Sequence, residues 1–220
     1  MDISRIARAM QRFTGTALTA TLSRIENEIE GITAERCAAF LSASGAERDA
    51  LVAAAHLKRI ASQVNVTIHA LGILLCLPHI LEPDEAIQYV SLGAGNTGRQ
   101  FDLETNRRIA EFKFIRWQGG PETIRQNSLF KDFMLLAEHR TEKSRYLYVL
   151  GVEHPLRFLR GRRAMNSVLS HVGLKERFVR IYGARFETVG EYFKAQKSKV
   201  SIEDVAPWLP ELIAEEAEPP

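Results

Sequence analysis

The feature that most constrains this fold is a pair of alternating segments with a short break between them. Residues 99–105 (RQFDLET) and 108–117 (RIAEFKFIRW) alternate polar and apolar side chains, and Asn106-Arg107 separates them. Alternation with a period of two is typical of β-strands, and a two-residue break suits a hairpin turn. We therefore expect an antiparallel hairpin here.

The segments around this hairpin predict an α/β fold with a helical N-terminal portion. The first eighty residues are rich in alanine and have the spacing of helices. Residues 86–92 and 145–152 have strand composition, and an amphipathic helix is expected to begin at Pro121 or Glu122. Further helices are expected at 155–170, 174–182 and 187–197. The expected organisation is an N-terminal helical region (1–54), an α/β core with basic C-terminal helices (55–200) and an acidic tail (201–220).

The composition is that of a globular protein from a reducing compartment. Of 220 residues, 45% are hydrophobic and 25% charged, and the two cysteines, Cys37 and Cys76, form no pairing or zinc motif. The N-terminus lacks an apolar signal core. The longest apolar run, residues 70–77, is much shorter than the roughly 20 residues of a membrane span. We expect a cytoplasmic protein that does not enter membranes.

Charge is distributed unevenly along the chain. Residues 105–199 contain 20 Lys and Arg against 9 Asp and Glu, a net charge of +11, whereas the whole chain has a net charge of +2. A basic half favours a polyanionic partner, because phosphates that bind it release condensed counterions. A solvated basic surface balanced by the acidic segments is the alternative.

A glycine-rich stretch raises the possibility of a nucleotide cofactor. Gly93, Gly95 and Gly98 form the spacing G-x-G-x-x-G of dinucleotide-binding turns. Such a site needs a helix after the glycines, so that the helix N-terminus faces the pyrophosphate. Here an alternating segment follows instead. We favour a tight turn, and keep a nucleotide-cofactor protein as the weakest of three functional hypotheses.

The expected hairpin brings acidic side chains and a lysine together. Asp102 and Glu104 share one face of their strand, and Glu111 and Lys113 share a face of the next. Neighbouring carboxylates repel, and a divalent cation relieves that repulsion. Carboxylate oxygens suit Mg²⁺ or Mn²⁺, and Lys113 can orient or help deprotonate a water molecule. The alternative is an exposed hairpin with charged side chains of both signs, such as Glu–Lys pairs, that have no chemical role.

Asp102 followed by Glu111-Phe112-Lys113 resembles the signature of the PD-(D/E)XK, or restriction-endonuclease-like, nuclease superfamily. The resemblance covers about residues 55–155. It implies a mixed central sheet flanked by helices, with the acidic hairpin at its centre. It further implies that Asp102 and Glu111 bind the metal, that Lys113 supports the nucleophilic water, and that two copies can pair as a homodimer to cut both strands.

Other positions extend this resemblance or depart from it. Some exonuclease and resolvase branches have a glutamine in the helix after the lysine, with an aromatic residue four positions later, which Gln126 and Phe130 match. Phe101 stands where the family often has proline. The preceding helix has no acidic residue to support the metal and offers His69, which we expect to be a hydrogen-bonded core residue. Glu82, Asp84 or Glu85 can substitute, or the site binds one metal ion.

The sequence therefore predicts a metal-dependent nuclease, with DNA favoured over RNA as substrate. Asp102, Glu111, Lys113 and Gln126 are the expected catalytic residues. The residues expected to contact nucleic acid are Arg125, Lys131, Arg157, Arg160, Arg162 and Arg163. The second hypothesis is a catalytically inactive nucleic-acid-binding module of the same fold. It predicts metal-independent binding that Lys113→Ala leaves unchanged.

Overall fold

The computed structural model describes residues 3–13, 18–46, 48–93, 100–117, 122–169 and 172–214. The chain divides into two compact units, residues 1–65 and 66–220, with the boundary inside a long helix. The first unit is helical, as the sequence predicts. Its elements are α1 (Ile3–Met10), η1 (Gln11–Phe13), α2 (Leu18–Ile29), α3 (Ala34–Ser44) and the first half of α4 (Arg48–Ile80).

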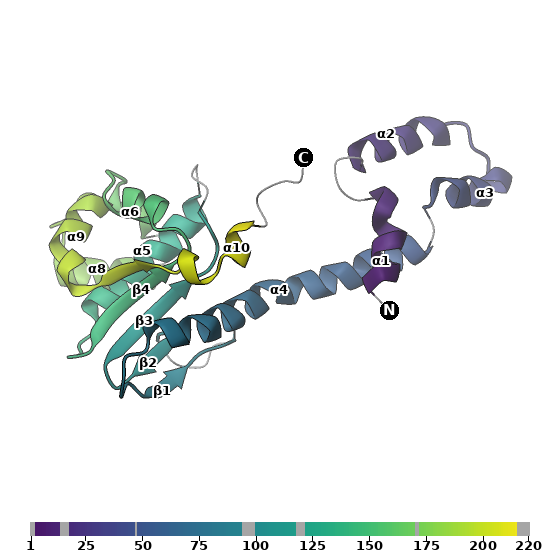
Figure 1. Cartoon of the computed structure of the whole chain (residues 1–220). Helices are drawn as coiled ribbons and strands as arrows, with labels where there is room; N and C mark the ends of the chain where they lie inside the picture. Colours follow the sequence, from purple (N-terminus) through teal and green to yellow (C-terminus); the bar gives the residue numbers. More distant parts are fainter. Residues whose placement is uncertain are drawn as a thin grey trace. The chain divides into compact units, whose positions relative to one another are not determined.

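A five-stranded mixed sheet forms the centre of the second unit (Figure 1). Its strands are β1 (Ile87–Val90), β2 (Leu103–Thr105), β3 (Arg108–Lys113), β4 (Ser144–Val149) and β5 (Ser201–Asp204), paired in that order. The β1–β2 and β2–β3 pairs are antiparallel, and the β3–β4 and β4–β5 pairs are parallel. The expected hairpin and the α/β class with a mixed, helix-flanked sheet are confirmed.

The C-terminal segment differs from the expectation of an acidic tail over residues 201–220. Ser201–Asp204 form the edge strand β5, which pairs with β4, and Ile202 packs against the larger hydrophobic cluster. The strand is followed by η4 (Ala206–Trp208) and α10 (Glu211–Ala214). The strand was missed because it is short and carries two acidic residues, and its stability comes from pairing with β4 rather than from its composition.

Helices cover both faces of the sheet because the strands of its centre are apolar on both sides. Ile109, Leu147 and Val149 face the larger hydrophobic cluster, and Phe112 and Tyr148 face the smaller one. The helices that form the larger cluster with the sheet are α5 (Thr123–Glu138), α6 (Glu153–Leu159), α7 (Met165–Val168), α8 (Val172–Tyr182) and α9 (Val189–Gln196), followed by η3 (Lys197–Lys199).

The C-terminal half of α4 covers the other face of the sheet. Ile73, Cys76 and Ile80 are buried in the smaller cluster. Gly72 permits this approach, because a Cβ atom there would lie 2.8 Å from the ring of Phe114. By length and composition, α4 is also long and apolar enough to cross a membrane, although its longest uninterrupted apolar run, residues 70–77, is short.

A buried arginine at the start of β3 holds the hairpin to the segment after α4. The guanidinium of Arg108 donates to both carboxylate oxygens of Glu85, at 2.6 and 2.5 Å, and to the Tyr148 hydroxyl at 3.1 Å. Thr105 Oγ1 donates to the same carboxylate at 2.5 Å. Burial raises the pKa of Glu85, but the hydrogen bonds from Arg108 and Thr105 outweigh it and lower that pKa to about 2.

We expect Arg108→Ala to lower the free energy of unfolding by about 3–5 kcal/mol, because it leaves the Glu85 charge buried without a partner. The loss should shrink as the pH approaches 4, where the unpaired Glu85 can take up a proton. Urea denaturation at pH 7 and pH 4 measures the loss of unfolding free energy and its dependence on pH. Arg107→Ala is the control: its ion pair with Glu82 is exposed, so it should cost less than about 1 kcal/mol. Equal losses in the two variants would contradict this role of Arg108.

Candidate active site

A partly buried ion cluster joins the C-terminal end of β3 to α5. Glu111 and Lys113 project from the same face of β3, and Asp132 projects from the buried side of α5. The Lys113 ammonium lies 3.0 Å from Glu111 Oε1 and 2.8 Å from Asp132 Oδ2. The Asp132 side chain is only 6% exposed, so this ammonium is its main source of charge compensation.

Asp102 lies beside this cluster, immediately before β2. Its backbone N–H donates to the carbonyl of Ala110 at 3.1 Å, and its Oδ2 accepts a hydrogen bond from the Phe112 N–H at 2.9 Å. Its Oδ1 lies 3.4 Å from Nε2 of His69 on α4. The carboxylate is thus held at the level of Glu111 by the adjacent strand and by the helix of the opposite layer.

Burial and the neighbouring charges shift the pKa values of Glu111 and Lys113. Burial raises the pKa of Glu111 to about 7; Lys113 opposes this rise, and the carboxylates of Asp132 and Asp102 add to it. Burial would lower the pKa of Lys113, but Asp132 and Glu111 outweigh it and raise that pKa. Lys113 therefore remains an ammonium at neutral pH, while Glu111 titrates near neutrality.

The structure brings together three of the four expected catalytic residues, Asp102, Glu111 and Lys113, and adds Asp132 and His69. Sequence reasoning missed Asp132. One feature of the sequence indicates it: Asp132 is the acidic residue among the buried residues of 129–137, and the others are apolar. A buried acid on the apolar side of a helix needs a cationic partner. The sequence predicts a hydrogen-bonded core residue at His69, but its side chain is 27% exposed, and its Nε2 lies 3.4 Å from Asp102 Oδ1.

Gln126 lies elsewhere, one and a half turns before Asp132 on α5, which is a rise of about 9 Å. Its Oε1 accepts a hydrogen bond from Arg163 Nη1. The two side chains line a hollow of about 290 Å³ together with Trp117, Phe158 and Arg157. The structure thus places Gln126 with the arginines and away from the carboxylates.

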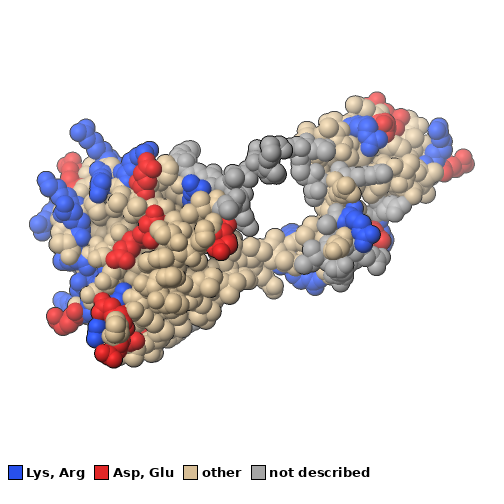
Figure 2. Space-filling view, viewed as in Figure 1, with Lys and Arg blue, Asp and Glu red and all other residues tan. Residues whose placement is uncertain are grey.

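The expected nucleic-acid contacts lie around this hollow and along α5. Arg160 and Arg162 are exposed, and Arg157 forms an exposed ion pair with Glu153. Arg125 contacts Glu122. Lys131 Nζ is 3.8 Å from Asp132 Oδ1, at the border of the ion cluster. Figure 2 shows that Lys and Arg side chains gather over the helices α6, α8 and α9.

The turn that carries Arg160, Arg162 and Arg163 is fixed by the start of α9. The N–H of Gly190 donates to the carbonyl of Gly161 at 3.0 Å, and the N–H of Val189 donates to that of Arg163 at 2.9 Å. The Gly190 Cα lies so close to this turn that a Cβ atom would be 2.7 Å from the carbonyl oxygen of Gly161. The three arginines are therefore presented on an ordered backbone.

Other parts of the sequence prediction have different outcomes. Glu104 forms an ion pair with Lys143 at 2.7 Å and is not part of the cluster around Lys113. Glu82 and Glu85 contact Arg107 and Arg108, so they do not replace a metal ligand. Gly95 and Gly98 lie outside the described residues; from Gln100 the chain leads into β2.

We expect Glu111→Gln to raise the melting temperature at pH 8 more than at pH 5. The raised pKa means that the folded protein binds a proton at Glu111 more tightly than the unfolded chain. Stability therefore falls as the pH rises from the ordinary value of 4.5 to about 7, and glutamine removes this loss. Thermal unfolding in metal-free buffer measures the difference. A gain that is the same at both pH values would contradict the assigned pKa.

We expect Gly190→Ala to lower the free energy of unfolding by about 1–3 kcal/mol and to displace the arginine-bearing turn, since the new Cβ meets backbone atoms. Gly173→Ala is the matched control, because a Cβ at that helical position has nothing within 4 Å. Thermal unfolding and NMR shifts of the Arg160–Arg163 amides report the two effects. A neutral Gly190→Ala would show that the turn is free to move.

Comparison with known proteins adds no assignment to this geometry. No protein-family model, no curated protein and no solved structure matches the chain. Any chemistry proposed for the cluster around Lys113 therefore rests on the residues of the cluster itself.

Proposed function

We propose that the protein is a metal-dependent nuclease that hydrolyses phosphodiester bonds, with DNA as the favoured substrate. The observation that supports this most is the Lys113 ammonium between Glu111 and Asp132, with Asp102 alongside. A lysine and several carboxylates at the end of a central strand are suited to bind a divalent cation and to stabilise the charge that develops on a phosphodiester. The net charge of +11 over residues 105–199 supports a polyanionic substrate.

The residues present fit a Mg²⁺ or Mn²⁺ ion. Asp102 and Glu111 supply hard oxygen donors. Burial raises the pKa of Glu111 and the neighbouring carboxylates of Asp132 and Asp102 add to that rise, and a bound cation would oppose both effects. Among the described residues, no group of three or more His, Cys, Asp or Glu side chains is placed to hold a metal. Two carboxylates suffice for Mg²⁺, which usually retains several waters and shares substrate phosphates. When bound, the ion would act as a Lewis acid toward the phosphate.

The protein's own residues would position and stabilise the reacting groups. Lys113 stays protonated, so it is suited to offset the charge that develops on the phosphate and to orient a water molecule by donating to it. Asp132 and Glu111 restrain the ammonium. His69 and the Phe112 N–H hold Asp102 in place. This role for Lys113 is narrower than the general-base role that the sequence left open.

One observation favours a second candidate, a catalytically inactive nucleic-acid-binding module. Lys113 is engaged by two carboxylates, and a structural ion cluster would look the same. In that case the cluster serves stability alone, and binding through the basic half needs no metal and no Lys113. The two candidates differ in whether cleavage occurs and in whether a divalent ion matters.

We expect cleavage of plasmid, linear duplex or single-stranded DNA with Mg²⁺ or Mn²⁺, and none with EDTA. Lys113→Ala, Asp102→Asn and Glu111→Gln should each reduce the rate by about 10²-fold or more. Lys143→Ala is the matched control, because it removes a lysine that pairs with Glu104 on the same sheet but outside the cluster. An assay on RNA run in parallel identifies the preferred substrate.

A second readout is independent of turnover. Mg²⁺ should raise the melting temperature of the wild type and have less effect on Glu111→Gln, since the ligand carboxylate is lost. Metal-independent binding without cleavage, unchanged in Lys113→Ala, would reject the nuclease in favour of the inactive module.

A further inference from the structure

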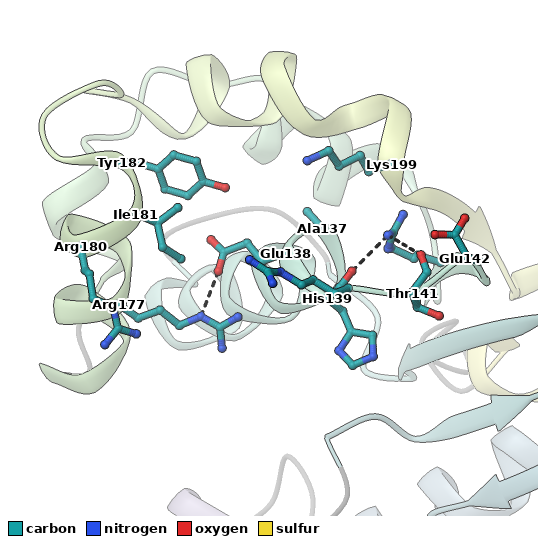
Figure 3. Close-up of a pocket in the computed structure, with 12 residues that line it drawn as sticks. Ala137, Glu138, His139, Thr141, Glu142, Arg177, Arg180, Ile181, Tyr182 and Lys199 are labelled. Carbon is teal, nitrogen blue, oxygen red and sulfur yellow. Dashed lines mark hydrogen bonds and ion pairs between the residues drawn. The ribbon is translucent and has the colours of Figure 1, made fainter.

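A large hollow lies at the opposite end of α5 from Gln126 (Figure 3). It measures about 1070 Å³ and is bordered by the C-terminal end of α5, the loop before β4, one side of α8 and Lys199 of η3. This volume is far larger than that of a single phosphate group. The basic residues at its border belong to the basic half of the chain, residues 105–199, for which the sequence predicts a polyanionic partner.

Basic side chains dominate the border of this hollow. Its cationic members are Arg140, Arg145, Arg177, Arg180 and Lys199. Two acidic residues border it as well, and one of them, Glu138, is compensated by Arg177 at 3.0 Å. Arg140, Arg180 and Lys199 are exposed and have no ion-pair partner in the part of the chain that the structure describes.

Hydrogen bonds hold some of the side chains that border this hollow in place. Arg145 Nη2 donates to the carbonyls of His139 and Thr141, at 3.1 and 3.0 Å, which fixes its guanidinium against the loop. Its Nε is buried and has no hydrogen-bond partner among the described residues. Tyr192 donates to Glu138 at 3.4 Å, so the Glu138–Arg177 pair is held from the protein interior. Figure 3 shows Arg177 beside Glu138, and Lys199 and Tyr182 across the hollow from them.

The geometry of the sheet relates this hollow to Lys113. Arg145 lies on β4, and Lys113 pairs with Val149, four residues further along the same strand. That separation is about 13 Å along the strand. On α5, Glu138 is six residues beyond Asp132, about 9 Å. For DNA stacked as in the B-form duplex, with a rise of about 3.4 Å per nucleotide, the hollow is three to four nucleotides from a phosphate at Lys113.

We propose that this hollow is a backbone subsite, which binds phosphates of the nucleic acid three to four nucleotides away from the phosphate at Lys113. The inference rests on the proposed nuclease function, because it takes Lys113 as the position of the scissile phosphate. Arg140, Arg180 and Lys199 contact the phosphates. The subsite contributes affinity and orientation rather than base recognition.

The test is a double charge reversal, Arg180→Glu with Lys199→Glu. Its matched control is Lys175→Glu with Lys197→Glu, which makes the same change in net charge on the same two elements, α8 and η3, at exposed positions outside the hollow. Binding is measured in EDTA, so that it does not depend on cleavage. The probes are single-stranded and duplex DNA of 12 nucleotides, a three-nucleotide strand and inorganic pyrophosphate.

We expect the double reversal to weaken binding of the 12-nucleotide DNA about tenfold and to reduce its salt dependence, and the control to have a smaller effect. Binding of the three-nucleotide strand should weaken less, because a stacked strand of that length cannot occupy the hollow and the position at Lys113 together. Equal losses in test and control variants would mean general electrostatics and overturn the subsite. Equal losses on short and long strands would overturn its distance from Lys113.

Two further outcomes separate this inference from the proposed function. A wild type that binds DNA through the hollow but cleaves nothing with Mg²⁺ would overturn the nuclease and leave a phosphate-binding surface. A reversal that affects only pyrophosphate would show a small-anion site and overturn the backbone subsite, whatever the outcome of the cleavage assay.

Discussion

The central strand β3 has a buried arginine at its start and a half-buried lysine at its end, and each of these charges joins the strand to another element. Removing a cation from water is costly, so each is stable only where carboxylates surround it. Arg108 meets Glu85 at the start of the strand, and Lys113 meets Glu111 and Asp132 at its end. The first contact joins the hairpin to the segment after α4. The second joins the sheet to α5.

The need of a charged side chain for partners of opposite charge has different consequences at the two ends of β3. The Arg108 guanidinium forms paired hydrogen bonds with Glu85, whose pKa falls to about 2. At the other end several carboxylates share one ammonium. There burial raises the pKa of Glu111 to about 7, which Lys113 opposes and the carboxylates of Asp132 and Asp102 reinforce. A compensated pair is a structural contact. An excess of buried negative charge, by contrast, is suited to a divalent cation, which supports a catalytic role for the Lys113 end.

Basic residues line two hollows at opposite ends of α5. One contains Gln126, Arg157 and Arg163. The other has Arg180 and Lys199 at its border. Asp132 lies between them on the same helix. A single helix thus carries an acidic residue of the cluster around Lys113 and has basic surroundings near both ends.

The sequence by itself determined the strand hairpin, the α/β class and the meeting of Asp102, Glu111 and Lys113, because period-two alternation and a two-residue turn are local properties. Tertiary structure decided what depends on contacts between distant segments. It added Asp132 and His69 from two helices, turned Gln126 toward Arg163, and made Ser201–Asp204 a strand. No local pattern specifies these, since burial and the partner across the sheet determine which charge a side chain meets.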